Sequence, residues 1–158
     1  MTEQDPDLRI KTAMAETPTA ALEDIARAAG TNVASVLRAL PEGEAHCIPG
    51  AHFVSVMDSF GDWGDMTLIV NTGNVILEAK GQVTGSVGRG FYNLGGKAVG
   101  GHLKFDACDM IAFVSRKLFG SDTHSIQFYD TKGDCMFKIY LGRDADRKLI
   151  PSQVQNYH

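Results

Sequence analysis

His102 stands in the sequence surroundings best suited to binding chemistry. It follows Gly100 and Gly101 and precedes Leu103, at the expected start of a strand. Glycines beside a strand allow a large flat ligand to approach the backbone closely, and an imidazole ring can ligate a metal or form hydrogen bonds. Strand alternation predicts that His102 and Leu103 point to opposite faces. Spacing alone leaves two interpretations open: a binding histidine, or a surface histidine held by a hydrogen bond.

The other residues able to do chemistry form no known motif. The remaining four histidines form no HxH or HxxxH pair, and the three cysteines form no CxxC pair. We interpret the cysteines, which sit beside apolar residues, as reduced and buried thiols. The chain also lacks a GxGxxG fingerprint after a strand, a Walker loop, HExxH and GxSxG. Asp144 and Asp146 follow Gly142-Arg143 near a strand end and are interpreted as surface charges.

From residue 48 onward, short runs of β-forming residues predict an antiparallel sheet. No run of ten helical residues separates the middle strands, which argues against parallel βαβ units. Thr72-Gly73 and the stretch 129–134 predict hairpin turns, and a short helix is expected from Pro151. Five residues of the last strands should share one buried face: Ile126, Phe128, Phe137, Ile139 and Leu141. The expected strands are 53–57, 66–71, 74–79, 90–94, 101–105, 109–117, 123–129 and 134–141.

The N-terminal part of the chain predicts helices. Apolar residues recur at helical spacing between residues 7 and 40, with a break at Thr17-Pro18. Gly30 should end the second helix, Thr31 should be the N-cap of the third, and Pro41 should stop it. We therefore divide the chain into a helical segment, 1–45, and an antiparallel sheet domain, 46–158.

Charge distribution bears on the class of partner. Residues 1–45 carry eight acidic and four basic side chains, whereas residues 46–158 carry eleven of each. The stretch 21–40 resembles a helix-turn-helix, which leaves two interpretations: a DNA-binding element, or two short helices packed on each other or on a partner domain. Because phosphate neutralisation supplies most non-specific affinity for nucleic acids, the acidic segment favours the second interpretation and argues against a nucleic-acid partner.

Hydropathy indicates the compartment. No run of about 18 apolar residues exists to span a membrane, and the acidic N-terminus lacks the apolar core of a secretory signal. We expect a cytoplasmic protein with no membrane partner.

Four stretches of the chain resemble the HutX/ChuX family of haem-utilisation proteins. They contain Trp63-Gly64 with Met66–Val70, Asn74–Glu78, Gly90–Leu94 with Gly96-Lys97 and Gly101-His102, and Met136–Asp144. The resemblance extends over about residues 20–157, and the order and spacing of the four stretches carry it. It implies an α+β fold like one half of the HemS/ChuS proteins: a large antiparallel sheet with flanking helices, paired into a homodimer.

The resemblance also implies a haem site. Haem needs an apolar slot, an axial ligand for iron, and cationic or hydrogen-bonding groups for its propionates. His102 matches a family histidine proposed as ligand, whereas the family's second candidate falls at Asn71, and asparagine ligates iron poorly. Two alternatives remain: His102 acts without a second histidine of its own chain, or it is not the ligand.

Other site residues follow from the same resemblance. Arg89 and Lys97 are candidates to bind the propionates, with Lys138 and Arg143 as weaker ones; the alternative for Arg89 and Lys97 is a solvated charge in a loop. Two interpretations stay open for Tyr92 and Phe91: one of them stacks on the porphyrin, or they pack in the core. Trp63 is expected either to line the cleft or to anchor a loop.

Three functions compete at this point. The favoured one is a cytoplasmic haem carrier that holds its cargo in a cleft, delivers it to a haem-degrading partner and is not itself an enzyme. The second is a haem-degrading enzyme, whose reactive chemistry would come from the iron and oxygen. The third is a helix-turn-helix regulator.

Overall fold

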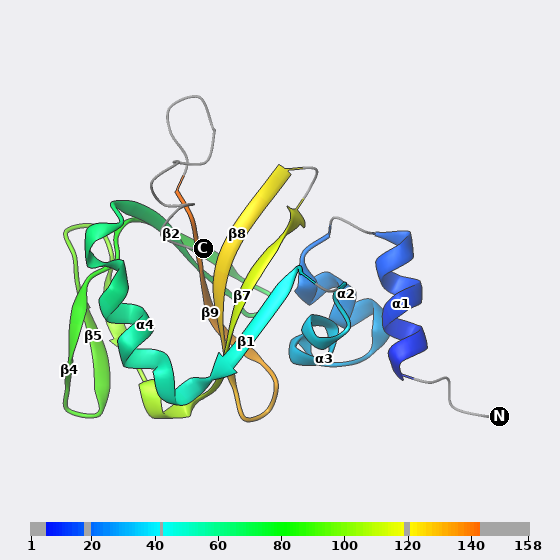
Figure 1. Ribbon diagram of the computed structural model, residues 1–158, viewed down its shortest axis with the longest axis horizontal. Coiled ribbons are helices and arrows are strands. Elements are labelled where there is room, and N and C mark those ends of the chain that lie inside the picture. Colours follow the sequence, from blue (N-terminus) through cyan, green and yellow to red (C-terminus); the bar gives the residue numbers. More distant parts are fainter. Residues whose placement is uncertain (1–5, 18–19, 42, 119–120, 143–158) are drawn as a thin grey trace.

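Three layers make up the fold in the computed structural model, which describes residues 6–17, 20–41, 43–118 and 121–142. A six-stranded sheet forms the middle layer (Figure 1). The N-terminal helices cover one face of this sheet, and a short helix with a three-stranded sheet covers the other. Both faces of the middle sheet are therefore covered over its central strands, whereas most residues of its edge strand β3 (Ile76–Gln82) are exposed.

The helical segment has the three helices that its sequence predicts. Gly30 ends the second helix in a left-handed conformation (φ 69°), as expected of a C-cap glycine. The N-cap of the third helix is Asn32 rather than Thr31, because the Asn32 side chain accepts a hydrogen bond from the Ser35 N–H at 2.9 Å. The helices are α1 (Pro6–Glu16), α2 (Leu22–Ala29) and α3 (Val33–Arg38).

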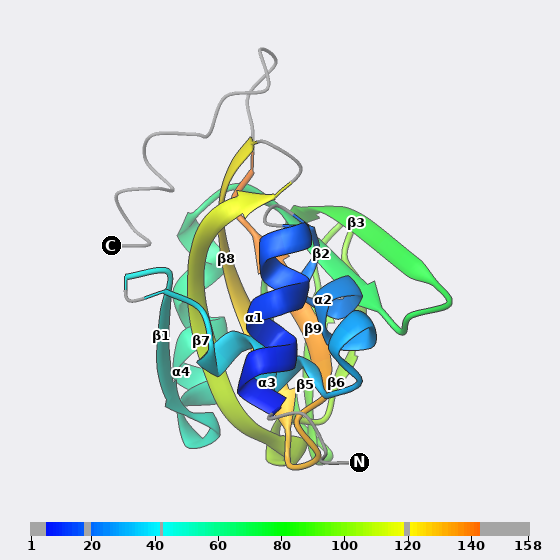
Figure 2. The same cartoon turned by 90° about the vertical axis from the view of Figure 1, so that its right-hand side faces the viewer.

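The helical segment packs on the sheet, as the second interpretation of its helix-turn-helix pattern predicts. Its buried side chains meet Ala112, Val114 and Tyr129 of the sheet. In Figure 2, α1 crosses in front of the sheet, and α2 and α3 lie beside α1. Within the described part of the chain, no helix is long and apolar enough to cross a membrane.

The large sheet is antiparallel throughout, as predicted, in the order β1-β7-β8-β9-β2-β3. The turn at Thr72-Gly73 joins β2 to β3, and the turn within 129–134 joins β8 to β9. The strands are β1 (Ala45–Pro49), β2 (Asp65–Asn71), β3 (Ile76–Gln82), β7 (Cys108–Leu118), β8 (Ser121–Asp130) and β9 (Cys135–Tyr140).

Strand alternation divides the large sheet into an apolar face and a mixed face. The five residues predicted to share a face are all buried in one core cluster, which confirms that prediction: Ile126, Phe128, Phe137, Ile139 and Leu141. The opposite face carries Gln127, Tyr129 and Lys138 and lies under the helical segment. Lys138 is buried there in an ion pair with Glu23 of α2 at 2.6 Å, which removes it from the candidate propionate anchors.

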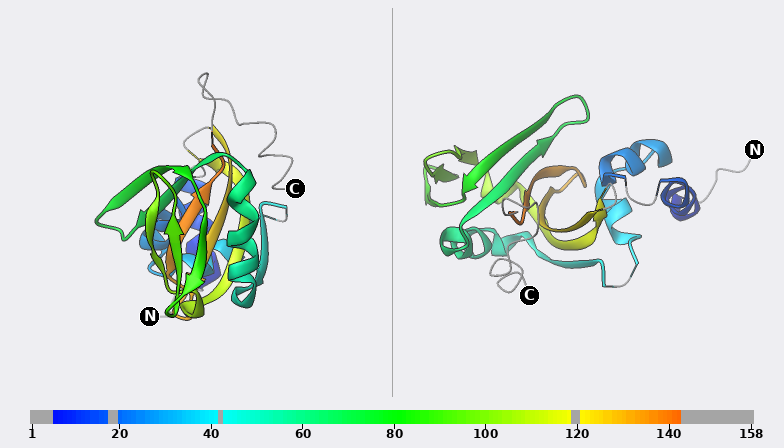
Figure 3. Two further views of the ribbon diagram at one scale, coloured as in Figure 1. Left: turned by 90° about the vertical axis from the view of Figure 1, so that its left-hand side faces the viewer. Right: turned by 90° about the horizontal axis from the view of Figure 1, so that it is seen from above.

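A three-stranded sheet, in the order β4-β5-β6, lies on the apolar face beside helix α4 (Figure 3). Its inner residues Tyr92 and Leu94, together with Val99 of the turn between β5 and β6, join Phe53 and Met57 of α4 in the core. Its other face is turned away from this core. The bounds are α4 (Phe53–Ser59), β4 (Gly85–Gly88), β5 (Phe91–Gly95) and β6 (Gly100–Leu103), with short 3₁₀ helices at Gly50–His52, Phe60–Asp62 and Phe105–Ala107.

One sequence prediction about the elements needs correction, and two strands were missed. The run 53–57 is helical rather than a strand, since Phe53 and Met57 lie four residues apart and are buried on one side of α4. Strands β1 and β4 were not predicted; β1 contains Pro49 and β4 is half glycine. The helix expected from Pro151 and the candidate Arg143 lie outside the described residues.

Candidate functional site

A pocket of about 410 Å³ lies on the outer face of the small sheet, opposite the core. It is lined by Gly88, Arg89, Phe91, Asn93 and His102. A cation, an aromatic ring and an imidazole thus share a pocket with a glycine whose backbone is accessible. His102, predicted from sequence as a binding residue, lies at this pocket.

Strand pairing explains why these side chains meet. Asn93 pairs with His102 across β5 and β6, and Gly88 pairs with Phe91 across β4 and β5. Directly paired residues of antiparallel strands project to the same face. The Phe91 ring lies edge-on to the imidazole, with 6.0 Å between centroids and 66° between planes.

Glycines extend this face beyond the lined pocket. Gly95 pairs with Gly100 and, two residues along β5 from Asn93, lies on the same face. A Cβ atom added to Gly95 would meet none of the described atoms within 4 Å. The protein's own packing therefore does not require glycine at this position.

The side chain of His102 is held from one side. Its Nδ1 atom lies 2.6 Å from Oδ1 of Asn93, and the residue is exposed. The hydrogen bond restricts rotation of the ring about its side-chain bonds. An exposed, oriented imidazole can take up a ligand without a rearrangement of the core.

Arg89 reaches the pocket from a strained turn. It has a left-handed φ of 54°, and the next residue, Gly90, has φ 84°. Two successive left-handed residues between paired strands form a tight hairpin turn in which asparagine and glycine are preferred. A long cationic side chain is thus presented at a backbone position that disfavours it.

Tyr92 does not line the pocket, which corrects its proposed position. Alternation turns it inward, where it is 1% exposed. Its hydroxyl lies 2.7 Å from the Asp58 carboxylate and 3.1 Å from the Gly85 carbonyl oxygen. Burial, together with the hydrogen bond to Asp58 and its charge, raises the pKa of Tyr92 well above the ordinary value. Of the two aromatic candidates on β5, Phe91 is the one at the pocket.

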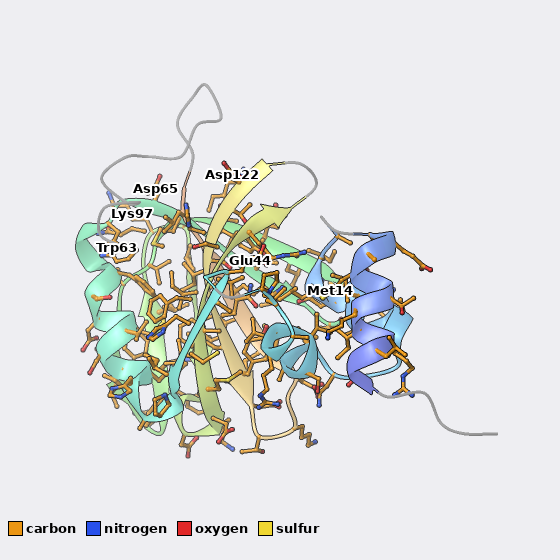
Figure 4. The ribbon with its side chains drawn as sticks, turned by 45° about the vertical axis from the view of Figure 1, so that its right-hand side comes forward. Met14, Glu44, Trp63, Asp65, Lys97 and Asp122 are labelled. Atoms are coloured by element: carbon orange, nitrogen blue, oxygen red, sulfur yellow. The ribbon has the colours of Figure 1, made fainter. Side chains whose placement is uncertain are left out.

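Three further residues suggested by the resemblance lie elsewhere. Lys97 is in the β5–β6 turn, at the opposite end of β5 from Arg89, and Trp63 packs edge-on against Phe60 at 5.1 Å. Figure 4 shows Trp63 and Lys97 toward the C-terminal end of α4. Asn71 ends β2, and its Oδ1 accepts a hydrogen bond from the Gly73 N–H at 2.9 Å. Their roles at a ligand remain predictions from the resemblance.

Sequence reasoning missed Asn93 and Gly88 as lining residues. Part of this could have been predicted. Phe91 and Asn93 lie two residues apart on one strand and so share a face, and the glycines at 95–101 indicate a turn back toward His102. Among the described residues, no three His, Cys, Asp or Glu side chains gather to form a metal site.

Comparison with known proteins identifies the family. The family described as haem utilisation ChuX/HutX matches residues 46–158. The chain belongs to the ChuX/HutX family. Its match to the intracellular heme transport protein HutX of Vibrio cholerae is 38% identical over 125 residues, 77% of this chain. The chain spans 65% of the length of that relative.

Solved structures agree with this membership of the ChuX/HutX family. The heme-binding protein ChuX is 37% identical, with a TM-score of 0.83 over 98% of this chain and 95% of ChuX. The ChuS structure, described as an Escherichia coli heme oxygenase, has a TM-score of 0.77 at 10% identity, over 99% of this chain and 48% of ChuS. That second likeness concerns the fold alone, and it confirms the expected resemblance to one half of a HemS/ChuS protein.

Proposed function

We propose that this protein binds haem at the pocket of the small sheet and carries it as cargo. The observation that carries the proposal is the meeting of Arg89, Phe91 and His102 on one glycine-bearing sheet face. The three groups supply an anchor for a propionate, an apolar contact for the porphyrin and a ligand for iron. The names of the relatives HutX and ChuX point to the same cargo.

The pocket suits a protein that transfers its haem more than one that stores it. His102 is exposed, and it lines the pocket on one face of the small sheet. A single replaceable ligand would let the iron pass to an acceptor, whereas two fixed ligands from one chain would slow that transfer. Asn71, where the resemblance implies the second histidine, instead serves its own turn.

Haemin titration of the apo-protein tests the proposal. The wild type should give a saturable, red-shifted Soret band at about one haem per chain. His102→Ala should weaken binding more than about tenfold, while His46→Ala, an exposed histidine on β1, should leave it unchanged. An unaltered Soret spectrum and affinity in His102→Ala would remove His102 from the role, and no specific band in the wild type would refute haem binding.

Carriage rather than degradation is part of the proposal. Adding a reductant to the haem complex under air should give slow bleaching that catalase suppresses. Ordered conversion to a bile pigment would contradict a carrier and support a haem-degrading enzyme. We further propose that the protein works in the cytoplasm and hands haem to a degrading partner, and the name of the relative, intracellular heme transport protein, supports that compartment.

We also propose that two copies pair through the β2–β3 hairpin. β3 is an edge strand of the large sheet, and it begins with exposed apolar residues: Ile76 and Leu77 are each 63% exposed. An exposed apolar edge favours association with another chain. A second copy is the fitting occupant, since ChuS is about twice as long and one half of it resembles this chain.

A further inference from the structure

The orientation of the Asn93 side-chain amide is determined by its neighbours. Its Nδ2 lies 3.1 Å from the Gly88 carbonyl oxygen and 3.5 Å from that of Ser86. Carbonyl oxygens accept hydrogen bonds and cannot donate them, so the NH₂ group must face them. The Oδ1 atom must therefore face His102, at 2.6 Å from Nδ1.

This orientation determines which ring nitrogen of His102 carries the proton. The Asn93 oxygen is an acceptor, so Nδ1 of His102 must be the donor. In a neutral imidazole, a proton on Nδ1 leaves a lone pair on Nε2. The exposed histidine is thus held in the tautomer whose free lone pair is available to a ligand.

The backbone around Asn93 makes room for this arrangement. Asn93 and His102 are direct partners in the strand pairing, which brings the two side chains together. A Cβ added to Gly88 would lie 3.2 Å from Nδ2 of Asn93, closer than ordinary contacts allow. Glycine at position 88 therefore leaves space for the amide to reach the carbonyl that orients it.

We propose that Asn93 is a positioning residue, which holds His102 in the Nδ1–H tautomer and so presents Nε2 to the haem iron. This inference rests on the proposed haem function. A hydrogen bond to the second nitrogen of a ligating histidine fixes the ring orientation and increases the basicity of the ligating nitrogen. Asn93 contributes this bond before any ligand arrives.

Two variants separate this role from a merely structural one. Asn93→Ala and Asn93→Asp both lose the NH₂ group that bonds to Gly88, but only Asn93→Asp keeps an oxygen acceptor toward His102. If the acceptor controls the tautomer, the aspartate variant should behave like the wild type at His102 and the alanine variant should not. Urea unfolding measures the cost of losing the Gly88 contact in both variants, to which Asn93→Asp adds the repulsion between its carboxylate and the carbonyl oxygens of Ser86 and Gly88.

The tautomer can be read in the apo-protein by long-range ¹H–¹⁵N NMR of the imidazole at about pH 8.5, above the ordinary histidine pKa. His102 should be in the Nδ1–H form in the wild type and in Asn93→Asp, and should shift toward the Nε2–H form in Asn93→Ala. An Nε2–H wild type, or an alanine variant with an unchanged tautomer, would overturn the proposal.

Haem binding then shows whether the tautomer matters for the cargo. Asn93→Ala should weaken haem binding about 10- to 100-fold, and Asn93→Asp should retain it. In the His102→Ala background, Asn93→Ala should have no further effect; a further loss would assign Asn93 a role that does not act through His102. Absence of haem binding by the wild type would refute the proposed function, while the NMR result would still decide the tautomer.

Discussion

Arg89 shows a conflict between backbone preference and side-chain chemistry. Its left-handed conformation costs about 1–2 kcal/mol for an ordinary L-residue, and asparagine is preferred at this position of a tight hairpin. Strained residues persist where the surroundings impose them and often mark functional sites. The strain at Arg89 coincides with the pocket that its side chain lines.

Replacing this arginine should therefore separate stability from binding. We expect Arg89→Asn to raise the free energy of unfolding by about 1 kcal/mol, because asparagine tolerates the left-handed region better. The same variant should bind haem more weakly, because it lacks the cation proposed to anchor a propionate. Urea denaturation and haemin titration measure the two effects. Lys132→Ala, at an exposed cation in the β8–β9 turn, is the control and should change neither; weaker haem binding by Lys132→Ala would show that the loss of any positive charge has this effect.

At the residue scale, the sequence predicts part of the site. The flanking glycines of His102 left two interpretations open, and the family resemblance added the binding role; strand alternation puts the neighbours Phe91 and Tyr92 on opposite faces. Alternation alone does not say which face is buried, because that depends on the large sheet against which the small one packs. For the same reason Asn93, whose importance comes from a partner nine residues away, could not be predicted without the strand register.

At the element scale, the small sheet presents an unobstructed glycine face. Gly95 has ordinary extended backbone, and no described atom lies within 4 Å of the place that a Cβ atom would take. Gly95→Val should leave the free energy of unfolding unchanged or raise it slightly, since valine favours strands more than glycine does. It should weaken haem binding, because a branched side chain would hold a flat ligand away from the sheet. Haemin titration tests the expected loss of binding, and urea denaturation tests the expected stability. Unimpaired binding would show that the ligand does not cover this part of the face.

The ion pair between Glu23 and Lys138 joins α2 to β9 across the interface of the helical segment. Both side chains are almost completely buried. Removing one partner of a buried pair leaves an uncompensated charge, so Glu23→Leu and Lys138→Met should each destabilise the protein by about 3 kcal/mol. The double variant Glu23→Leu with Lys138→Met should regain much of that loss. A double-mutant cycle in urea measures the coupling, and strictly additive losses would contradict it.

Elements differed in how well they could be predicted. Long alternating strands and capped helices were predicted well, as β8, β9 and α2 illustrate. The segment that forms α4 contains two β-branched valines, which favour strands. Its helical pattern of buried residues can be recognised only when the sheet on which it packs is known. Strands β1 and β4 are short, and they exist because longer neighbours pair with them.

At the scale of the whole molecule, buried proton-binding groups determine the response to alkali. Burial raises the pKa of the Cys108 thiol to about 11 and that of Cys135 to about 12. Burial alone would lower the pKa of Lys138, but neighbouring Tyr140, Glu23 and Cys135 raise it overall. Each group holds its proton more tightly in the folded state than in the unfolded state.

Stability should therefore be lost on the alkaline side. A raised folded pKa contributes stability that is complete below the unfolded value and disappears as the pH rises through the folded value. For the Cys108 thiol that interval runs from pH 9.0 to about 11. We expect the free energy of unfolding to decline across it, and Cys108→Ala to show a shallower decline. Urea denaturation at pH steps measures this, and a flat profile to pH 11 would contradict the assignment.

The proposed pairing of two chains also belongs to the whole molecule. Figure 3 shows the β2–β3 hairpin extending away from the body of the large sheet, and Ile76 and Leu77 place apolar side chains on its β3 strand. Two like edges can pair by their backbones while these side chains leave water.

Ile76→Asp should disrupt that contact, because paired copies would bring like charges into a desolvated interface. Sedimentation should show a dimer for the wild type and a folded monomer for Ile76→Asp. Val87→Asp, at an exposed apolar residue of the small sheet, should remain a dimer as the control. A monomeric wild type would refute the pairing, and a dimeric Ile76→Asp would move the interface to another surface.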